Sequence, residues 1–194
     1  MEWLLLVPAY FLGTFPSAVM VAKSRGVDIY AVGSGNPGAS NVARSLGNRW
    51  GVLVFVLDGL KGAIPAAVGV HLLDNRALAY GMVAAAIVGH MFPITRRFRG
   101  GKGVATFAGA SLVFYPVVGI IVGPLWYVVR KLTGKASLAT FSLGVAWPIG
   151  VAIAGAPAWE IVAIFAISLL VLVRHADNIR RLISGTELSG SHGG

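Results

Sequence analysis

Six long apolar runs follow one another along the chain, separated by short polar segments. Their approximate bounds are 3–22, 51–73, 77–93, 104–129, 137–154 and 158–173. A helix needs about 20 residues to cross the hydrocarbon core of a bilayer, within a range of about 17–25. Most runs fit that length, so the pattern predicts an all-α polytopic membrane protein.

The fourth run, 104–129, is long for a single span and carries Pro116 near its middle. Proline removes an amide donor and clashes with the preceding helical turn. We therefore expect a break near Pro116 that divides this run into a short helix pair. The break brings the total to seven transmembrane helices, with the amino terminus outside and the carboxyl terminus cytoplasmic.

The basic residues support this topology. With seven helices, fifteen of the sixteen Lys and Arg residues lie on or near one side, and only Arg76 lies on the other. Cytoplasmic loops of membrane proteins carry such an excess of positive charge. The pattern therefore predicts that the polar segments between the spans face the cytoplasm.

The composition agrees with a membrane protein. Apolar residues make up 56% of the chain and charged residues only 12%, too few to cover a water-soluble globule. The net charge of +9 by itself would suit nucleic acid, but the basic residues are dispersed among apolar spans, so we expect no nucleic-acid partner. Cysteine is absent, which excludes disulfides and thiolate metal sites. We expect one membrane-embedded domain over 1–188 and a linker or tag remnant at 189–194.

The first candidate site is the glycine-rich loop 33–44, which follows a short strand-like run at 27–32. It contains Gly-x-Gly-x-x-Gly, yet Pro37 lies inside the pattern and no repeated strand–helix units surround it, which argues against a dinucleotide-binding fold. Closely spaced glycines nevertheless let backbone amides approach an anion. An ordinary cytoplasmic loop is the alternative. The side chains that this loop offers to an anion are Ser34, Asn36, Asn41 and Arg44.

The second candidate is a pair of charges inside the second apolar run. Asp58 and Lys61 are three residues apart, so they share one helical face and can pair. Buried charges in membrane helices usually face a polar interior. Either the two form a structural ion pair, or Lys61 points into the site and Asp58 holds it there.

The third candidate is the segment 99–106, at the start of a predicted helix. It is not a P-loop, because the upstream glycine is missing and no Ser or Thr follows the lysine. Glycines at a helix amino terminus still present amides and the positive end of the dipole to an anion. A plain basic turn is the alternative. The residues concerned are Gly100, Gly101, Lys102, Gly103 and Thr106, and the nearby His90 is more typical of a packed residue than of a catalyst.

The fourth candidate follows the last span. His175, Asn178 and Arg181 recur at three-residue spacing and share one helical face. A juxtamembrane basic helix on anionic lipid headgroups is the alternative, although it leaves the His and Asn unexplained. We expect Asp177 and Glu187 to anchor the tail to the bundle.

These four segments, in this order, closely resemble the bacterial acyl-phosphate–glycerol-3-phosphate acyltransferases (the PlsY type) over essentially the whole chain before the tail. The family usually has Arg-Glu where this chain has Ala176-Asp177. The resemblance implies transfer of a fatty acyl group from acyl phosphate to the sn-1 hydroxyl of glycerol 3-phosphate. The products are lysophosphatidic acid and phosphate, in the first acylation of bacterial phospholipid synthesis, at the cytoplasmic face of the inner membrane.

The resemblance also implies roles for the site residues. Membrane lipid, acyl phosphate and glycerol 3-phosphate are the expected partners; no cofactor and no metal are expected. Attack is expected to be direct, without an acyl-enzyme, and the proton acceptor is either His175 or the substrate's own phosphate. The catalytic residues are Ser34, Arg44, His175 and Asn178; the substrate-binding residues are Asn36, Asn41, Lys61, Gly100, Gly101, Lys102, Gly103, Thr106 and Arg181; the structural residues are Asp58 and Glu187.

Three other functions compete with this one. A transporter of an organic phosphate would suit a broken helix and an intramembrane ion pair, but no internal repeat relates the two halves. A structural protein that binds anionic lipid leaves the glycine-rich loops unexplained. A metal-dependent phosphotransferase needs several acidic ligands together, and the seven acidic residues are scattered.

Overall fold

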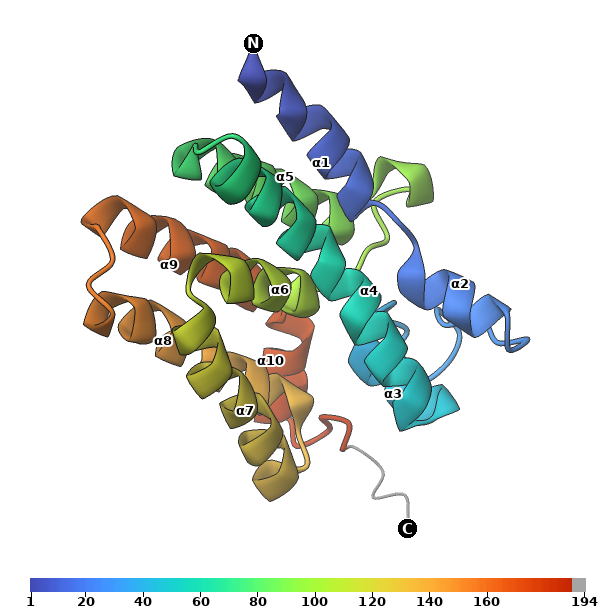
Figure 1. The fold of residues 1–194 in the computed structure, drawn as a ribbon. Coiled ribbons are helices and arrows are strands. Elements are labelled where there is room, and N and C mark those ends of the chain that lie inside the picture. The colour runs from blue at the N-terminus through green and yellow to red at the C-terminus, as the bar shows by residue number, and fades with distance from the viewer. Residues whose placement is uncertain (190–194) are drawn as a thin grey trace. The chain divides into compact units, whose positions relative to one another are not determined.

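The structure is a computed structural model that describes residues 1–189, and over that range every regular element is a helix (Figure 1). The expected linker or tag remnant at 189–194 lies outside the described residues apart from Ser189. The chain divides into two compact units between Phe114 and Tyr115. The single domain expected over 1–188 stays a prediction.

The first unit contains six α-helices and three shorter turns of helix. Helices α1 and α5 pack together, and α4 packs against α3, α5 and α6. A 3₁₀ turn (Glu2–Leu5) precedes α1, a π-helical turn (Val68–Leu72) follows α4, and a second 3₁₀ turn (Ile94–Arg96) follows α5. The helices are α1 (Leu6–Gly13), α2 (Ser17–Lys23), α3 (Ala39–Leu46), α4 (Asn48–Ala67), α5 (Arg76–Met91) and α6 (Val104–Phe114).

The second unit contains four helices, of which α8 packs against both α7 and α9. They are α7 (Pro116–Thr133), α8 (Ala136–Ile153), α9 (Ala158–Val173) and α10 (Ala176–Ile183). Helix α10 is bent by 57° away from α9, because the chain turns at Arg174 and His175.

The break expected near Pro116 is confirmed. Helix α6 ends at Phe114, Tyr115 leaves the helical conformation with φ −141°, and Pro116 begins α7. Proline suits the first position of a helix, where an amide donor is not needed. Within the second unit the Tyr115 hydroxyl donates to Glu160 Oε2 at 2.8 Å, which ties the start of α7 to the first turn of α9.

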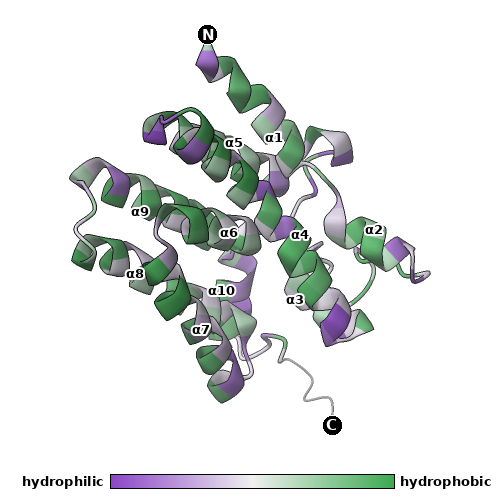
Figure 2. Cartoon of the chain, viewed as in Figure 1, coloured by the Kyte–Doolittle hydropathy of each residue, from purple (hydrophilic) through white to green (hydrophobic). Residues whose placement is uncertain are grey.

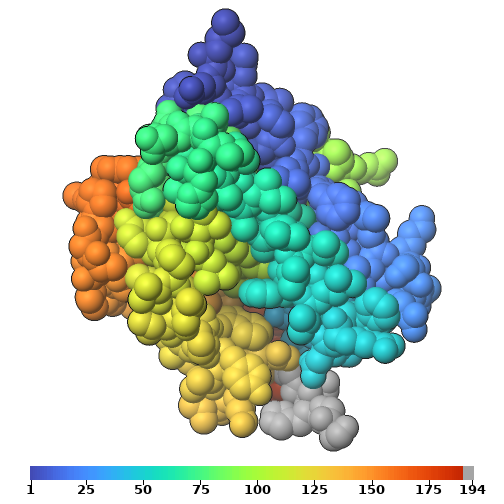
Figure 3. Space-filling model, viewed as in Figure 1, coloured from blue at the N-terminus to red at the C-terminus, as the bar shows by residue number. Residues whose placement is uncertain are grey.

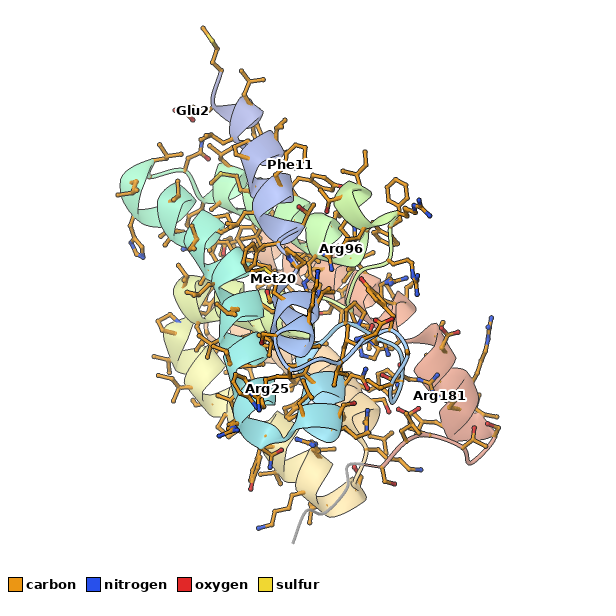
Figure 4. All side chains as sticks on the ribbon, turned by 90° about the vertical axis from the view of Figure 1, so that its right-hand side faces the viewer. Glu2, Phe11, Met20, Arg25, Arg96 and Arg181 are labelled. Carbon is orange, nitrogen blue, oxygen red and sulfur yellow. The ribbon has the colours of Figure 1, made fainter. Side chains whose placement is uncertain are left out.

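The first apolar run is also broken, which the hydrophobic pattern did not predict. Helix α1 ends at Gly13 and α2 begins at Ser17, after Pro16. At this break the carbonyl of Thr14 accepts a hydrogen bond from a side chain, because Arg96 Nη2 donates to it at 3.0 Å. Figure 4 marks the course of this segment from Glu2 to Arg25, with Arg96 beside the break.

Helices α4 and α6 lie close enough for backbone contact. A Cβ at Gly62 would collide with the carbonyl oxygen of Thr106. Small residues permit such an approach between membrane helices, where packing rather than water exclusion drives association. The start of α6, and with it the segment 100–103, is thereby fixed against the helix that carries Asp58 and Lys61.

Most residues of the long helices are hydrophobic, whereas α10 is largely polar (Figure 2). Helix α4 exposes large hydrophobic side chains, among them Phe55, Leu60 and Ile64. Side chains of α4 form part of the surface turned to the viewer in Figure 3. Five segments are long and apolar enough to cross a membrane, or six if α9 and α10 form one bent span. The five are Glu2–Lys23, Asn48–Leu72, Arg76–Arg96, Pro116–Thr133 and Ala136–Ile153.

Candidate active site

Residues 27–32 form turns rather than the strand-like run expected from their apolar sequence. The side chain of Asn41 holds these turns in place. Asn41 is 2% exposed, and its Nδ2 donates to the carbonyls of Ile29 at 3.2 Å and Val32 at 3.0 Å. Its Oδ1 accepts the amide of Ser34 at 2.9 Å. A strand needs a partner strand for its backbone groups, and here a buried amide side chain satisfies them instead.

These contacts favour a structural role for Asn41 over the substrate contact expected from the sequence, because both of its amide protons already have acceptors. Arg44 lies one helical turn further along α3, and its Nη1 is 3.5 Å from Asn41 Oδ1. Ser34, Asn36 and Arg44 are half-buried, so they remain accessible at the surface of the loop. Gly33 and Gly35 both adopt positive φ, as a tight anion-suited loop requires.

The two glycine-rich segments of the first unit lie side by side. The Tyr30 hydroxyl donates to the carbonyl of Arg99 at 2.9 Å. The Arg99 guanidinium in turn lies 4.5 Å from the centre of the Tyr30 ring. The turn that leads into 33–44 therefore contacts the residue that leads into 100–103, although 69 positions separate them.

The segment 100–103 does open a helix, as predicted. Helix α6 begins at Val104, and the amide of Phe107 donates to Gly103 O at 2.9 Å. The amides of the residues before Phe107 have no acceptor within the helix, and they add to its positive dipole end. Lys102 is half-buried in this segment, which places a compact positive charge at the same helix end.

Thr106, in the first turn of α6, is 0% exposed. Its hydroxyl oxygen is buried and has no hydrogen-bond partner among residues 1–189. Buried hydroxyl groups normally have a partner. The substrate-binding role expected for Thr106 stays a prediction.

Asp58 and Lys61 form the ion pair that their spacing predicted. Lys61 Nζ lies 2.6 Å from Asp58 Oδ1, and both side chains are 3% exposed. Lys61 also donates to the carbonyl of Phe15 at 2.6 Å and lies 3.4 Å from His90 Nδ1. These contacts favour the structural interpretation of Lys61, so its substrate-binding role stays a prediction.

His175 is buried at the bend between α9 and α10. Its Nδ1 lies 2.7 Å from the carbonyl oxygen of Val171, and the Phe141 ring meets the imidazole edge-on at 5.9 Å. A carbonyl can only accept, so Nδ1 carries the proton and Nε2 is the basic nitrogen of the neutral ring. This fixes both the tautomer and the orientation that a general base needs.

The carboxylate of Glu187 accepts hydrogen bonds from side chains of α8 and α10 in the second unit. Its Oε1 accepts from Asn178 Nδ2 at 2.6 Å and from Ser137 Oγ at 2.8 Å, and its Oε2 accepts from Arg181 Nε at 2.9 Å. Burial by itself would raise the pKa of Glu187, but the hydrogen bonds from Asn178, Arg181 and Ser137 outweigh it and hold the pKa below its ordinary value. Glu187 therefore anchors the tail to α8 and α10.

Asp177 does not share this role. Its carboxylate is 75% exposed and pairs with Arg180 on the same helix at 3.5 Å, so the anchoring expected of Asp177 is wrong. Ser137 and Tyr30 were missed by sequence reasoning because a lone Ser in an apolar helix and a lone Tyr in a turn carry no motif. No group of three or more His, Asp or Glu side chains that could hold a metal occurs within the described part of the chain.

The fold and these groups define a class of protein: an all-helical integral membrane protein with two anion-suited, glycine-rich loops in one unit and a buried histidine in the other. The family model for glycerol-3-phosphate acyltransferase matches residues 3–185. The chain belongs to this family.

Curated relatives agree over nearly the whole length. The glycerol-3-phosphate acyltransferase of Geobacter metallireducens is 47% identical over 188 residues, which is 96% of each chain. That of Aquifex aeolicus is 38% identical over 185 residues, 94% of this chain and 96% of the relative.

A solved structure has the same fold. The crystal structure of PlsY (YgiH), an integral membrane glycerol 3-phosphate acyltransferase, in its glycerol 3-phosphate form superposes with a TM-score of 0.89 at 37% identity, covering 97% of this chain and 94% of the other. The lysophosphatidic acid form gives a TM-score of 0.88.

Proposed function

We propose that this protein transfers a fatty acyl group from acyl phosphate to the sn-1 hydroxyl of glycerol 3-phosphate. The products are lysophosphatidic acid and phosphate. The observation that carries the proposal is the likeness, over 97% of the chain, to a membrane acyltransferase in its glycerol 3-phosphate form. Acyl phosphate as the donor rests on the resemblance of the four sequence segments and on the basic, anion-suited loops.

Two clusters in the first unit suit two phosphate groups. We assign the phosphate of glycerol 3-phosphate to Lys102 and the amides of Gly100 and Gly103, at the positive end of α6. The Gly101 amide donates to the His90 carbonyl at 3.1 Å, so Gly101 contributes close backbone approach rather than a donor. We assign the phosphate of the donor, or its acyl carbonyl, to Ser34, Asn36 and Arg44, whose guanidinium suits a bidentate contact.

The chemical step is a direct displacement. The sn-1 hydroxyl oxygen attacks the acyl carbonyl carbon, a new C–O ester bond forms, and the C–O bond to phosphate breaks, so that phosphate leaves with the bonding electron pair. His175 Nε2 takes the hydroxyl proton, since Nδ1 is committed to Val171 O. Asn178 orients the hydroxyl and Arg181 adds positive charge. The donor is already an activated mixed anhydride, so positioning and charge stabilisation suffice without an acyl-enzyme.

We also propose seven membrane helices, with α6 as the short one. The amino terminus lies outside, the carboxyl terminus lies in the cytoplasm, and the active site is at the cytoplasmic face of a bacterial inner membrane. Asn75 Nδ2 donates to Glu2 Oε2 at 3.3 Å, which supports the placement of Arg76 at the amino-terminal, outer end of the first unit. The chain has no native cysteine, so single cysteines at Lys131 (inside) and Ala154 (outside) test this topology by labelling in intact cells.

The deciding experiment uses the purified protein with acyl phosphate, acyl thioester or no donor, each with glycerol 3-phosphate. We expect product only in the reaction that contains acyl phosphate, with one phosphate released for each lysophosphatidic acid formed. Uptake of glycerol 3-phosphate into reconstituted vesicles without turnover would instead identify a transporter. Equal rates with the thioester would leave the acyltransferase intact and overturn the donor assignment.

A further inference from the structure

A buried polar cluster of Asp58, Lys61 and His90 lies inside the first unit and has no part in the chemical step above. The three residues are 2%, 3% and 5% exposed. Ionisable residues are rare and costly inside membrane segments, and they are commonly functional there.

Lys61 uses its three ammonium protons on three acceptors from three different segments. They are Asp58 Oδ1 on its own helix α4, the carbonyl of Phe15 at the break between α1 and α2, and His90 Nδ1 on α5, at 2.6, 2.6 and 3.4 Å. An ammonium group has three donors and no acceptor. Lys61 therefore holds the Nδ1 edge of the His90 ring, which also lies 3.8 Å from Asp58 Oδ1.

The opposite edge of the His90 ring faces the phosphate-binding segment 100–103. A Cβ at Gly101 would collide with His90 Nε2 and lie 2.9 Å from Cε1, and the three nearest atoms are all in that ring. The Gly101 amide also donates to the His90 carbonyl at 3.1 Å. The imidazole therefore fills the space between Lys61 and the backbone of Gly101, next to Lys102.

We propose that His90 is a positioning residue: held by the Asp58–Lys61 pair, its ring is the surface against which the segment 100–103 keeps the conformation that binds the phosphate of glycerol 3-phosphate. The inference rests on the proposed function of that segment. His90 does not touch the substrate and takes no proton in the reaction. Its contribution lies in ground-state binding, because it fixes the segment that holds the phosphate and not the reacting atoms. Displacing such a segment by about 1 Å can lower the efficiency of an enzyme roughly a hundredfold.

The test compares His90→Ala with His90→Asn, with His71→Ala as the matched control, because His71 is exposed and lies outside the cluster. In His90→Ala we expect the KM for glycerol 3-phosphate to rise by about tenfold to a hundredfold, while kcat stays within about threefold of the parent. Asn keeps an acceptor oxygen close to the position of Nδ1 but lacks the ring edge that faces Gly101, so His90→Asn restores folded protein and leaves the KM for glycerol 3-phosphate raised. His71→Ala leaves both constants unchanged.

A double-mutant cycle identifies the contact itself. Gly101→Ala raises the KM for glycerol 3-phosphate in the parent, because the new Cβ pushes against the ring. In the His90→Ala background the same substitution adds little, since the obstacle is gone. Additive effects of the two substitutions would overturn the proposal.

Other outcomes also overturn it. An unchanged KM in His90→Ala, a fall in kcat alone, or a loss of folded protein that Asn does not rescue would each do so. Failure of the proposed function gives a different result, since the parent protein itself would then neither turn over nor bind glycerol 3-phosphate in titration calorimetry.

Discussion

The Tyr30 hydroxyl donates to the Arg99 carbonyl at 2.9 Å while the Arg99 guanidinium lies over the Tyr30 ring. This single pairing joins the two glycine-rich segments of the first unit. Tyr30→Phe keeps the ring and removes the hydrogen bond, whose net contribution is about 0.5–1.5 kcal/mol. We expect the KM for both substrates to rise by about twofold to tenfold with kcat unchanged. Steady-state kinetics measures this, and Tyr127→Phe, at an exposed position, is the control.

Lys102 provides the charge at the amino terminus of α6. We expect Lys102→Ala to lower kcat/KM for glycerol 3-phosphate by roughly tenfold to a hundredfold, since hydrogen bonds to charged groups contribute about 1.5–3 kcal/mol. Lys102→Arg keeps the positive charge and should recover part of the lost kcat/KM. A matched Lys131→Ala variant, at an exposed residue near the end of α7, should behave like the parent. If Lys102→Ala changed only the KM for acyl phosphate, the segment 100–103 would bind the donor phosphate instead.

His175 Nε2 is the proposed proton acceptor. His175→Ala should lower kcat by about a hundredfold to ten-thousandfold, the range for a lost general base, with little change in the KM for glycerol 3-phosphate. Rapid-quench measurement of the acyl-transfer step checks that chemistry is affected. If only KM rises, His175 orients the substrate and the substrate's phosphate takes the proton.

Glu187 stabilises the second unit through three accepted hydrogen bonds. Glu187→Gln removes the charge and turns a donor toward Asn178 or Arg181, so we expect a loss of about 1–3 kcal/mol. This lowers the Tm in detergent by roughly 2–4 °C for each kcal/mol. Asp177→Asn, at an exposed carboxylate, should leave the Tm unchanged.

The same carboxylate predicts a pH dependence. The folded state holds the pKa of Glu187 below its ordinary value of 4.5. The stabilisation is therefore complete above about pH 4.5 and is lost as the pH falls through the folded pKa. The Tm difference between the parent and Glu187→Gln should shrink below pH 4.5. A difference that stays constant down to pH 3 would show that the carboxylate charge is not the stabilising element.

Metal removal tests the expected absence of a catalytic ion. We expect turnover of acyl phosphate to be unchanged after dialysis against a strong chelator, because backbone amides and basic side chains supply the positive potential at both phosphates. Loss of activity that magnesium restores would contradict this.

The sequence by itself determined the features that depend on neighbouring residues. The apolar runs gave the membrane helices, Pro116 gave the break between α6 and α7, and the three-residue spacing of Asp58 and Lys61 gave their ion pair. Each follows from helix geometry or from the transfer of a short segment into lipid, which a local pattern records.

Only the tertiary structure decided the contacts between distant segments. It joined Lys61 to Phe15 across 46 positions, Tyr30 to Arg99 across 69 and Ser137 to Glu187 across 50. It also directed the Asn41 side chain to the carbonyls of Ile29 and Val32, while the substrate contact expected of Asn41 stays a prediction. A polar side chain takes whichever donor or acceptor the packing brings within about 3 Å, and a pattern along the chain does not contain that choice.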